Sequence, residues 1–518
     1  MFNIGTTDFP ADAMGDYTFA KEDIVLLGIT ITTNENESTE KNFTTRLKAM
    51  KNILKQWSRR KMSLKGKITV INALALSLIV YPASVLITPN NVLEEINKIL
   101  YEFLWDGKRP KIAAKIMESS IKLGGLKMPN IFLKVKAWQL AWLQRALKKP
   151  NTNWAVIVNE LIPNIKLTDL MHCNLDAKHH FIETLPIFYK DIICTWFNLK
   201  RQFRAVEIDI TNNSLWLNKE ITVDGKEIFW VNWYKKGIQF IKDILNENGN
   251  FLDAEQLNAK YGVNTNFLSV LQIRQSLPYH WRQQIMNLNI IRPTIPELSL
   301  KFTMKNIPFT KLKTFQFYQM LIKLEQDRHG SHPKCIIKWN NTFNNELQVW
   351  KDIFSRPFIV CRSTRLQSFQ FRLLHRIITC NHWLFNAGIK GSPNCETCNI
   401  DDTLIHFFID CVHVENFWSN FRIWWSDVTL LPGINLSNKD LLLGITKSEK
   451  NFLTLNYIIM LANKFIHDNK MAAMKQVSFP AFLITLKLQL NYEKQICMKN
   501  NLFTAFNEKW NWLYAQLH

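Results

Sequence analysis

The sequence contains little that would indicate a secreted or disulfide-bonded protein. Nine cysteines occur in 518 residues, and six of them lack the regular spacing of a disulfide framework: Cys173, Cys194, Cys335, Cys361, Cys380 and Cys497. The first 23 residues are polar and acidic, without the basic segment, apolar run and small-residue cleavage site of a secretion signal. We therefore expect a reducing compartment, either the nucleus or the cytoplasm.

Long uncharged stretches are also scarce. One runs from Ile68 to Leu93, which is long enough for a helix to cross a bilayer. Pro82 interrupts it, and it contains Asn72, Asn90 and Asn91 together with several serines and threonines. A buried core helix therefore fits this stretch better than a membrane span, and no membrane partner is expected.

Acidic residues are few relative to basic ones. The chain has 64 lysines and arginines against 43 aspartates and glutamates, a formal net charge of +21. Residues 41–150 hold 22 basic and five acidic side chains, whereas residues 1–40 hold one basic and eight acidic. Such a basic segment is typical of a surface that contacts a phosphate backbone. A solvated basic face that keeps a large protein dissolved would have the same composition, so both interpretations stay open.

Apolar residues recur mainly with the period of a helix. Leu47, Met50 and Leu54 have this spacing, with lysines between them, and predict an amphipathic helix with a basic outer face. Strand-like alternation occurs only near residues 24–32 and 221–230. We expect a mainly α, multi-domain helical fold with a small β-hairpin near the N-terminus.

The basic residues of this segment are the candidates for phosphate contacts, although each could equally be a solvated side chain. They are Lys48, Lys51, Lys55, Arg59, Arg60, Lys61, Lys65, Lys67, Lys108, Arg109, Lys111 and Lys115.

Four residues further along have the spacing of a metal site. Cys395, Cys398, His406 and Cys411 form a Cys-x2-Cys-x7-His-x4-Cys pattern. Two thiolates three residues apart can bind one ion from a tight turn, and the His–Cys pair can complete a tetrahedron, for which zinc is the natural ion. Four protein ligands leave no open position, so a structural Zn²⁺ is expected. The alternative is a group of buried thiols beside a satisfied histidine, and His413 could replace His406 as a ligand.

Aromatic residues follow this pattern at helical spacing: Phe407, Phe408, Phe417, Trp418, Phe421, Trp424 and Trp425. Most are expected to pack against a predicted helix at 366–378, and a minority could stack on unpaired bases. Arg372 and Arg376 lie just upstream and would supply phosphate contacts. His375, Cys380 and His382 have no evident carboxylate partner, so no catalytic residues are assigned.

Several stretches resemble LINE-type, non-LTR retrotransposon reverse transcriptases. Residues 67–81, KITVINALALSLIVY, are similar to the thumb helix of that family, and residues 99–130 have its Phe/Leu-Trp turn, basic run and Gly-Gly-Leu-x-x-Pro-Asn-like element. Residues 26–29 resemble the primer-grip hairpin, the last strand pair of the palm. The cysteine pattern with Phe417-Trp418 resembles the zinc-binding domain at the C-terminal end of these proteins.

The resemblance implies an RNA-directed DNA polymerase, but the residues for that chemistry are missing from the sequence. Such an enzyme holds two metal ions with paired carboxylates on adjacent palm strands. Only 23 residues precede the grip-like hairpin, and they contain no aromatic-Ala-Asp-Asp element. The one Asp-Asp pair, Asp401-Asp402, lies within the cysteine pattern, where a solvated turn is expected. We therefore expect no polymerase activity from this chain.

Together with the resemblance, these features predict five segments. They are residues 1–40 with a remnant palm hairpin, 41–150 as a basic thumb-like helical domain, 151–350 as a helical connector, 351–430 as a zinc-knuckle domain and 431–518 as a C-terminal helical region. The implied function is binding of RNA, DNA or an RNA–DNA duplex through backbone contacts. Two alternatives stay open: a transposon-derived scaffold that binds proteins and not nucleic acid, and an accessory part of an active reverse transcriptase whose palm another chain supplies.

Overall fold

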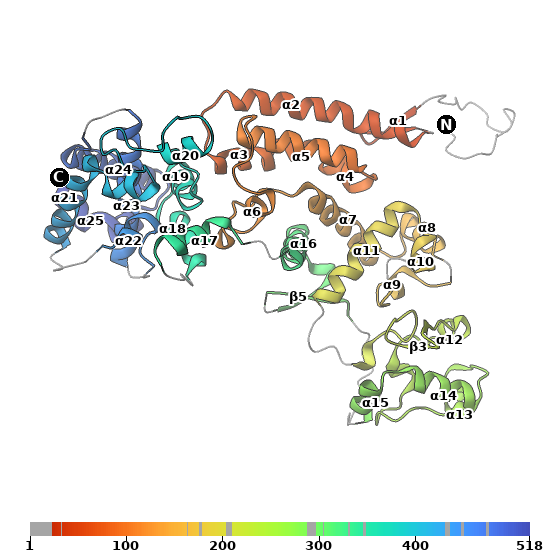
Figure 1. Ribbon diagram of the computed structural model, residues 1–518. Helices are drawn as coiled ribbons and strands as arrows, with labels where there is room; N and C mark the ends of the chain where they lie inside the picture. Colours follow the sequence, from red (N-terminus) through yellow and green to blue (C-terminus); the bar gives the residue numbers. More distant parts are fainter. Residues whose placement is uncertain are drawn as a thin grey trace. The chain divides into compact units, whose positions relative to one another are not determined.

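The computed structural model describes residues 23–32, 34–162, 164–175, 179–203, 210–286, 297–303, 305–329, 332–344, 349–429, 436–446, 450–472 and 476–517 (Figure 1). Most of the predicted N-terminal segment, residues 1–22, lies outside this part. The chain divides into two compact units, each assembled from separated stretches. Unit 1 takes in Met1–Met50, Leu76–Asn97 and Asn130–His329, and unit 2 takes in Lys51–Ala75, Lys98–Pro129 and Gly330–His518. The boundaries of the five predicted segments divide the chain differently and remain a prediction.

Unit 1 is mainly helical, as predicted for the chain. Its N-terminal part consists of β1 (Asp23–Leu26), β2 (Ile29–Thr32), α1 (Glu35–Thr39), η2 (Glu40–Thr44), η4 (Leu76–Leu78) and α4 (Val80–Val85). It continues with α7 (Ile131–Lys148), α8 (Asn153–Glu160), α9 (Leu167–Leu170), α10 (His180–Glu183), α11 (Ile187–Gln202), η6 (Ile210–Asn212), β3 (Thr222–Val223), β4 (Lys226–Glu227) and α12 (Val231–Lys235). It ends with η7 (Ile241–Ile244), α13 (Ala254–Tyr261), α14 (Phe267–Ser276), α15 (Tyr279–Met286), β5 (Ser299–Phe302), β6 (Lys305–Pro308), η8 (Phe309–Lys311) and α16 (Thr314–His329).

The regular elements of unit 2 in its described residues are all helices. Its first two stretches hold α3 (Leu64–Val70), η3 (Ile71–Ala75), α6 (Ala114–Glu118) and η5 (Ile121–Leu123). The third holds α17 (Lys334–Thr342), α18 (Trp350–Val360), α19 (Thr364–Leu374), α20 (Asn381–Asn386), η9 (His406–Asp410), α21 (Val412–Thr429), α22 (Asn438–Leu443), α23 (Lys450–Met471), α24 (Phe479–Lys499) and α25 (Phe503–Leu517). Helices α2 (Thr45–Ser58) and α5 (Asn90–Trp105) contribute residues to both units.

Strands are confined to three two-stranded antiparallel sheets in the described residues. The hairpin predicted at 24–32 is confirmed as β1–β2, in which Ile24 lies opposite Ile31. Its turn, Leu27-Gly28, has positive φ at both positions, 51° and 77°, and such turns match the twist of the paired strands. Residues 221–230 hold only the very short pair β3–β4, and the hairpin β5–β6 was not predicted.

The uncharged stretch from Ile68 to Leu93 corrects the prediction of one buried core helix. It is broken into the end of α3, the π-helical turn η3, the short 3-10 helix η4 and α4. The side-chain amide of Asn72 donates to the Ile68 carbonyl at 2.9 Å, where it competes with the backbone of the helix. No helix in the described ranges is both long and apolar enough to cross a membrane.

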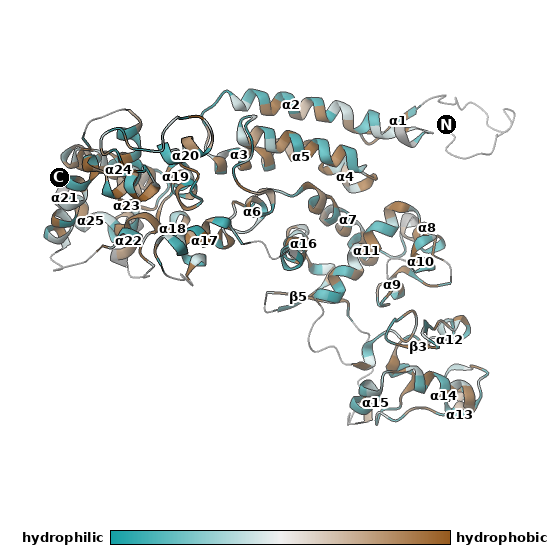
Figure 2. Ribbon diagram, viewed as in Figure 1, coloured by the Kyte–Doolittle hydropathy of each residue, from teal (hydrophilic) through white to brown (hydrophobic). Residues whose placement is uncertain are grey.

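Helix α2 has the two faces that its sequence predicts. Its apolar residues Leu47, Met50 and Leu54 are buried. Its lysines Lys48, Lys51 and Lys55 are exposed, and Figure 2 shows hydrophilic colours along much of the helix. Burying an apolar side chain of this size contributes about 1.5–3 kcal/mol, so the buried face holds the helix and leaves the lysines in solvent.

The Gly124-Gly125 step of unit 2 is explained by its surroundings. Gly124 has φ of 84°, a conformation that disfavours other residues, and its carbonyl oxygen lies 2.8 Å from Nε2 of His375. A Cβ on Gly125 would come within 2.1 Å of the Ser119 carbonyl oxygen. The two glycines therefore let the chain after α6 approach its own backbone and reach α19.

The core of unit 2 is built around helix α23. Leu455, Ile458, Ala462 and Ile466 of this helix are buried, and the helix packs against α18, α19, α24 and α25. A helix that is apolar on most sides needs neighbours on most sides. Helix α23 also packs against η9, the turn of the cysteine loop that begins at His406.

Candidate metal centre

The first cysteine pair lies on a tight turn. Asn394 and Asp401 form an isolated antiparallel bridge, and the Cys395 amide donates to the Ile400 carbonyl at 2.8 Å. The Asn399 amide donates back to the Cys395 carbonyl at 2.9 Å, with Asn399 in the left-handed region at φ of 55°. Asparagine tolerates that region better than most residues. The turn therefore presents Cys395 and Cys398 on one side of a closed loop.

The second ligand pair is joined by the π-helical turn η9. His406 begins this turn, and Cys411 follows its last residue. The Cys411 amide donates to the His406 carbonyl at 3.0 Å, a bond between residues five apart. Such turns are rare and often occur at functional sites. The x4 interval of the sequence pattern is thus the length of one π-helical turn, which brings both ligands to the same side.

All four predicted ligands converge. One ligand atom from each of Cys395, Cys398, His406 and Cys411 lies within 4.8 Å of the others. The sulfurs of Cys398 and Cys411 are 3.9 Å apart, which is too far for a disulfide. Zinc–sulfur bonds of about 2.3 Å at tetrahedral angles place two sulfurs about 3.8 Å apart. The group can therefore hold a metal ion, and its geometry is compatible with zinc.

The surroundings of the cluster affect its thiols differently. Burial alone would raise the pKa of Cys395, but the backbone N–H groups of Cys398 and Thr397 and the Lys470 ammonium lower it. Burial raises the pKa of Cys411 to about 11, against the His413 amide and Lys470. A metal ion binds thiolates and displaces such protons.

Lys470 is a residue of this site that the sequence pattern did not reveal. It lies on α23, and its ammonium donates to the Phe407 carbonyl at 3.2 Å. The ammonium also lies 4.2 Å from the centre of the Phe407 ring. A lysine 59 residues beyond the last cysteine has no recognisable spacing to it. It provides positive charge beside three sulfurs that would carry negative charge as metal ligands.

The alternatives to a metal site do not fit this arrangement. Both ring nitrogens of buried His406 lack a hydrogen-bond partner within the described part of the chain, so it is not a satisfied core histidine. His413 is not a ligand, because its Nε2 lies 2.8 Å from the Thr397 hydroxyl. His406 is thus the histidine of the group.

The aromatic residues after the loop are core residues. All of those predicted except Trp424 are buried. Phe408 faces Phe369 of α19, as predicted, but Phe417 packs against Phe479 and Phe482 of α24. Unpaired bases cannot reach these buried rings, so the prediction that a minority of the aromatic residues stack on bases is wrong for the buried ones.

No protein-family model matches the chain. It is similar to a transposon protein. The Transposon TX1 uncharacterized 149 kDa protein of Xenopus laevis is 26% identical to it over 526 residues. The similarity covers 89% of this chain and 38% of that protein, so the chain spans well under half the length of its relative.

Most of the predicted phosphate contacts are accessible. The exposed ones are Lys48, Lys51, Lys55, Arg59, Arg60, Lys61, Lys108, Arg109, Lys111, Lys115 and Arg372. Lys65 and Arg376 are half-buried. The Lys65 ammonium donates to the Gln367 side chain at 3.0 Å, and Arg376 lies over the ring of Trp339 at 4.3 Å. These two have protein partners as well as partial access to solvent.

Lys67 does not fit its predicted role. Its side chain is only 5% exposed, and its ammonium lies 2.6 Å from the Asp106 carboxylate and 3.2 Å from the Leu104 carbonyl. The ammonium is therefore already paired inside unit 2 and is not accessible to phosphate. Its helical spacing alone could not distinguish it from its exposed neighbours.

Two further expectations are corrected at the cysteine loop. Asp402 is not in a solvated turn, because it is buried and accepts a hydrogen bond from the Asn381 amide at 2.9 Å. His382 does have a carboxylate partner, since its Nδ1 lies 2.8 Å from Asp401. That partner lies 19 residues away in sequence and approaches through the loop fold.

Proposed function

We propose that this chain is a nucleic-acid-binding segment of a LINE-type transposon protein that holds RNA or an RNA–DNA duplex through phosphate contacts. The similarity to a transposon protein supports the origin. The resemblance of residues 67–81 and 99–130 to the reverse-transcriptase thumb supports the role. Because the relative is much longer than this chain, polymerase activity of a complete protein would depend on parts outside this sequence.

The observation that carries this proposal is the exposed basic series that runs along the last turns of α2 and ends at the residue after it. Lys51, Lys55 and Arg59 are spaced four residues apart, and all three are exposed. Eight residues of helix extend about 12 Å, which matches the rise of roughly three to four base pairs. A series of this length can therefore follow several successive phosphates while the opposite face of α2 stays in the core.

The proposed metal is a structural zinc ion. Cys395, Cys398, His406 and Cys411 would fill all four positions, leaving none for a water or substrate. When bound, the ion would supply folding energy to a loop that is too short for a core of its own. The same closed set argues for a supporting role, in which the loop keeps α20 and α21 in place.

A salt titration of affinity tests the proposal. The triple variant Lys51→Gln, Lys55→Gln, Arg59→Gln should lower the slope of log affinity against log salt by about 2–3 for an RNA–DNA duplex, since each lost phosphate contact removes about 0.7–0.9. The matched control is Lys226→Gln, Lys235→Gln, Lys260→Gln, which removes three exposed lysines outside the basic segment. Wild-type affinity that does not change with salt, together with a stable oligomer, would favour the scaffold alternative.

A further inference from the structure

A cavity of about 610 Å³ lies beside the cysteine loop in unit 2. Helix α17, the turn after α19, helix α20 and the loop residues before His406 line it. Its size is within the range of sites that hold small molecules. Because Thr403 and Leu404 lie three and two residues before the ligand His406, the loop that can hold the metal also forms one wall of the cavity.

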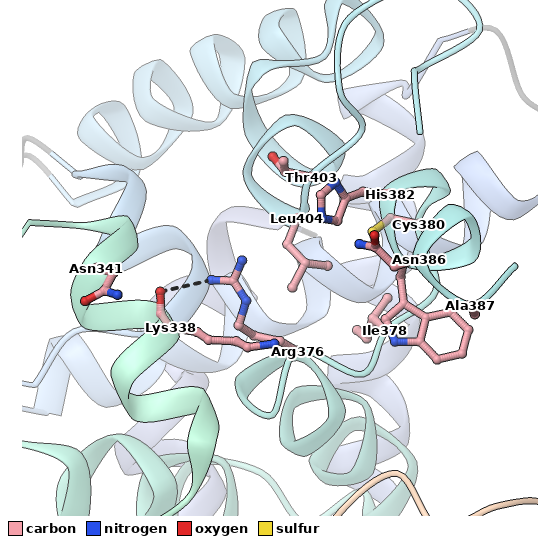
Figure 3. Close-up of a pocket in the computed structure, with 11 residues that line it drawn as sticks. Lys338, Asn341, Arg376, Ile378, Cys380, His382, Asn386, Ala387, Thr403 and Leu404 are labelled. Atoms are coloured by element: carbon pink, nitrogen blue, oxygen red, sulfur yellow. Dashed lines mark hydrogen bonds between the residues drawn. The ribbon is translucent and has the colours of Figure 1, made fainter. Parts of the chain in front are cut away.

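The lining combines cations, amides and an apolar surface. Lys338 and Arg376 contribute positive charge, and His382 and Asn386 contribute ring and amide nitrogens. In Figure 3, Lys338 and Arg376 lie on one side of the cavity, with His382 and Asn386 on the other. Trp383 and Leu404 add apolar area. A ligand with an anionic end and a flat, partly apolar end with polar edges would match this lining.

Arg376 is held in place by an unusual backbone conformation. It has φ of 56° at the end of α19, where its amide donates to the Leu373 carbonyl and the Ile377 amide donates to the Arg372 carbonyl. Glycine is the usual residue at this position of such a helix end, because side chains are strained there. The guanidinium also donates to the Thr342 hydroxyl at 2.9 Å. The chain thus has an arginine at a position where its backbone conformation is strained, and the side chain of this arginine lines the cavity.

A further cation, Lys111, contacts the lining residue Trp383. The Lys111 ammonium lies 4.4 Å from the centre of the Trp383 ring. Burial lowers the pKa of Lys111, and the neighbouring charges of Arg372 and Lys108 lower it further. An anion close to Lys111 would offset the repulsion that it experiences from Arg372 and Lys108.

The cavity is suited to binding and not to nucleophilic catalysis. Cys380 and His382 both line it, and His382 is oriented by Asp401, an arrangement that resembles a thiol nucleophile with its base. Burial, however, raises the pKa of the Cys380 thiol, and the nearby carboxylates of Asp402 and Asp401 add to this effect. A buried thiol that stays protonated is unreactive.

We propose that this cavity binds one nucleotide unit with an unpaired base, its phosphate against Lys338 and Arg376 and its base against Trp383 and Leu404. This inference rests on the proposed nucleic-acid-binding function and adds a site selective for single strands. Base stacking on aromatic side chains and backbone contacts to cations are the two features of such sites. A base within a duplex cannot enter, because pairing and stacking occupy its edges and faces.

Fluorescence anisotropy with a labelled single-stranded 12-mer and with the duplex of the same sequence tests the site. Lys338→Ala and Arg376→Gly should each weaken single-strand binding by about tenfold, the usual effect of losing a charged hydrogen bond, and leave duplex binding unchanged. Arg376→Gly is suited to the left-handed backbone, which offsets the loss of the contacts with Thr342 and Trp339, so the variant should still fold. Lys334→Ala, an exposed lysine on the same helix outside the cavity, is the matched control.

The outcomes separate this site from the basic series on α2. The cavity proposal would be overturned if single-strand affinity stayed within twofold of wild type in both variants. It would also be overturned if the variants lost duplex affinity to the same extent as single-strand affinity. In either case, duplex binding by wild type with the expected salt slope would leave the proposed function standing. Absence of duplex binding by wild type would instead count against the proposed function. A free nucleoside 5′-monophosphate that competes with the 12-mer, in wild type but not in Arg376→Gly, would identify a free nucleotide as a ligand of the same cavity.

Discussion

The cysteine loop and helix α2 both gather polar side chains, but they arrange them in opposite ways. In the loop, four ligand atoms converge within 4.8 Å, and three of the four residues are buried. On α2, the lysines point into solvent along the helix, and the apolar residues are the buried ones. Four converging ligands can bind one small ion, whereas cations spread along a helix need an extended anionic partner such as a phosphate backbone. Burial therefore predicts which kind of partner a polar cluster requires.

The largest expected effect comes from breaking the convergent group. Cys411→Ser should abolish binding of one zinc per chain and cause the loop around residues 395–411 to lose its structure. Structural zinc contributes on the order of 10–16 kcal/mol of apparent binding energy in small domains at neutral pH, so the loss should be measurable as a lower thermal midpoint. Metal analysis and thermal unfolding of the purified chain measure both.

Cys194→Ser is the matched control for that prediction, because Cys194 is a half-buried free cysteine of α11 in unit 1. It should keep one zinc per chain. If Cys411→Ser also kept one zinc with an unchanged midpoint, the geometric assignment of the four ligands would be wrong.

A second effect should come from a buried group that stays uncharged. Burial lowers the pKa of His375 to about 4, although its contact with the Gly124 carbonyl opposes this. A lowered folded-state pKa means that the stabilisation is present above about pH 6.5 and is lost as pH falls through about 4. The free energy of unfolding should fall by on the order of 3 kcal/mol across that range.

His375→Gln should flatten this pH dependence, as followed by urea unfolding at a series of pH values. His332→Gln replaces an exposed histidine of the same unit and should leave the pH profile as it is in wild type. A profile that is equally steep in His375→Gln would show that other groups cause the loss of stability in acid.

The smallest expected effect compares a buried lysine with an exposed one. Lys67→Met removes the hydrogen bonds to Asp106 and Leu104 and should lower the free energy of unfolding by about 1–3 kcal/mol, with the salt slope unchanged. Lys51→Met should do the reverse: stability within about 0.5 kcal/mol of wild type and a salt slope lower by about 0.7–0.9. Equal effects of both variants on the slope would contradict the division into buried and exposed cations.

Sequence reasoning succeeded where the signal was local. The period of Leu47, Met50 and Leu54 predicts the buried face of α2, and the intervals among the cysteines and His406 correspond to one tight turn and one π-helical turn. The mainly helical fold and the N-terminal hairpin follow from the same kind of local pattern.

The remainder depends on contacts between distant residues. The pairing of Lys67 with Asp106, the approach of Lys470 to the cysteine loop and the contact of His382 with Asp401 have no spacing that a sequence pattern could reveal. The breaks between residues 68 and 93 cannot be predicted from the sequence, because a continuous apolar run does not show where a helix changes its winding. The cavity beside the loop has no sequence signal either, because its lining comes from four elements that lie apart in the sequence.

The interleaving of the stretches that make up unit 2 has a consequence for synthesis of the chain. Helix α3 and the turn η5 pack against α19 and α18, which are made more than two hundred residues later. As the ribosome proceeds, α3 and η5 must therefore wait for these packing partners until residue 374 has emerged. At roughly 5–20 residues per second, this interval lasts on the order of 10–60 seconds, and during it a chaperone that binds apolar segments would have its best opportunity.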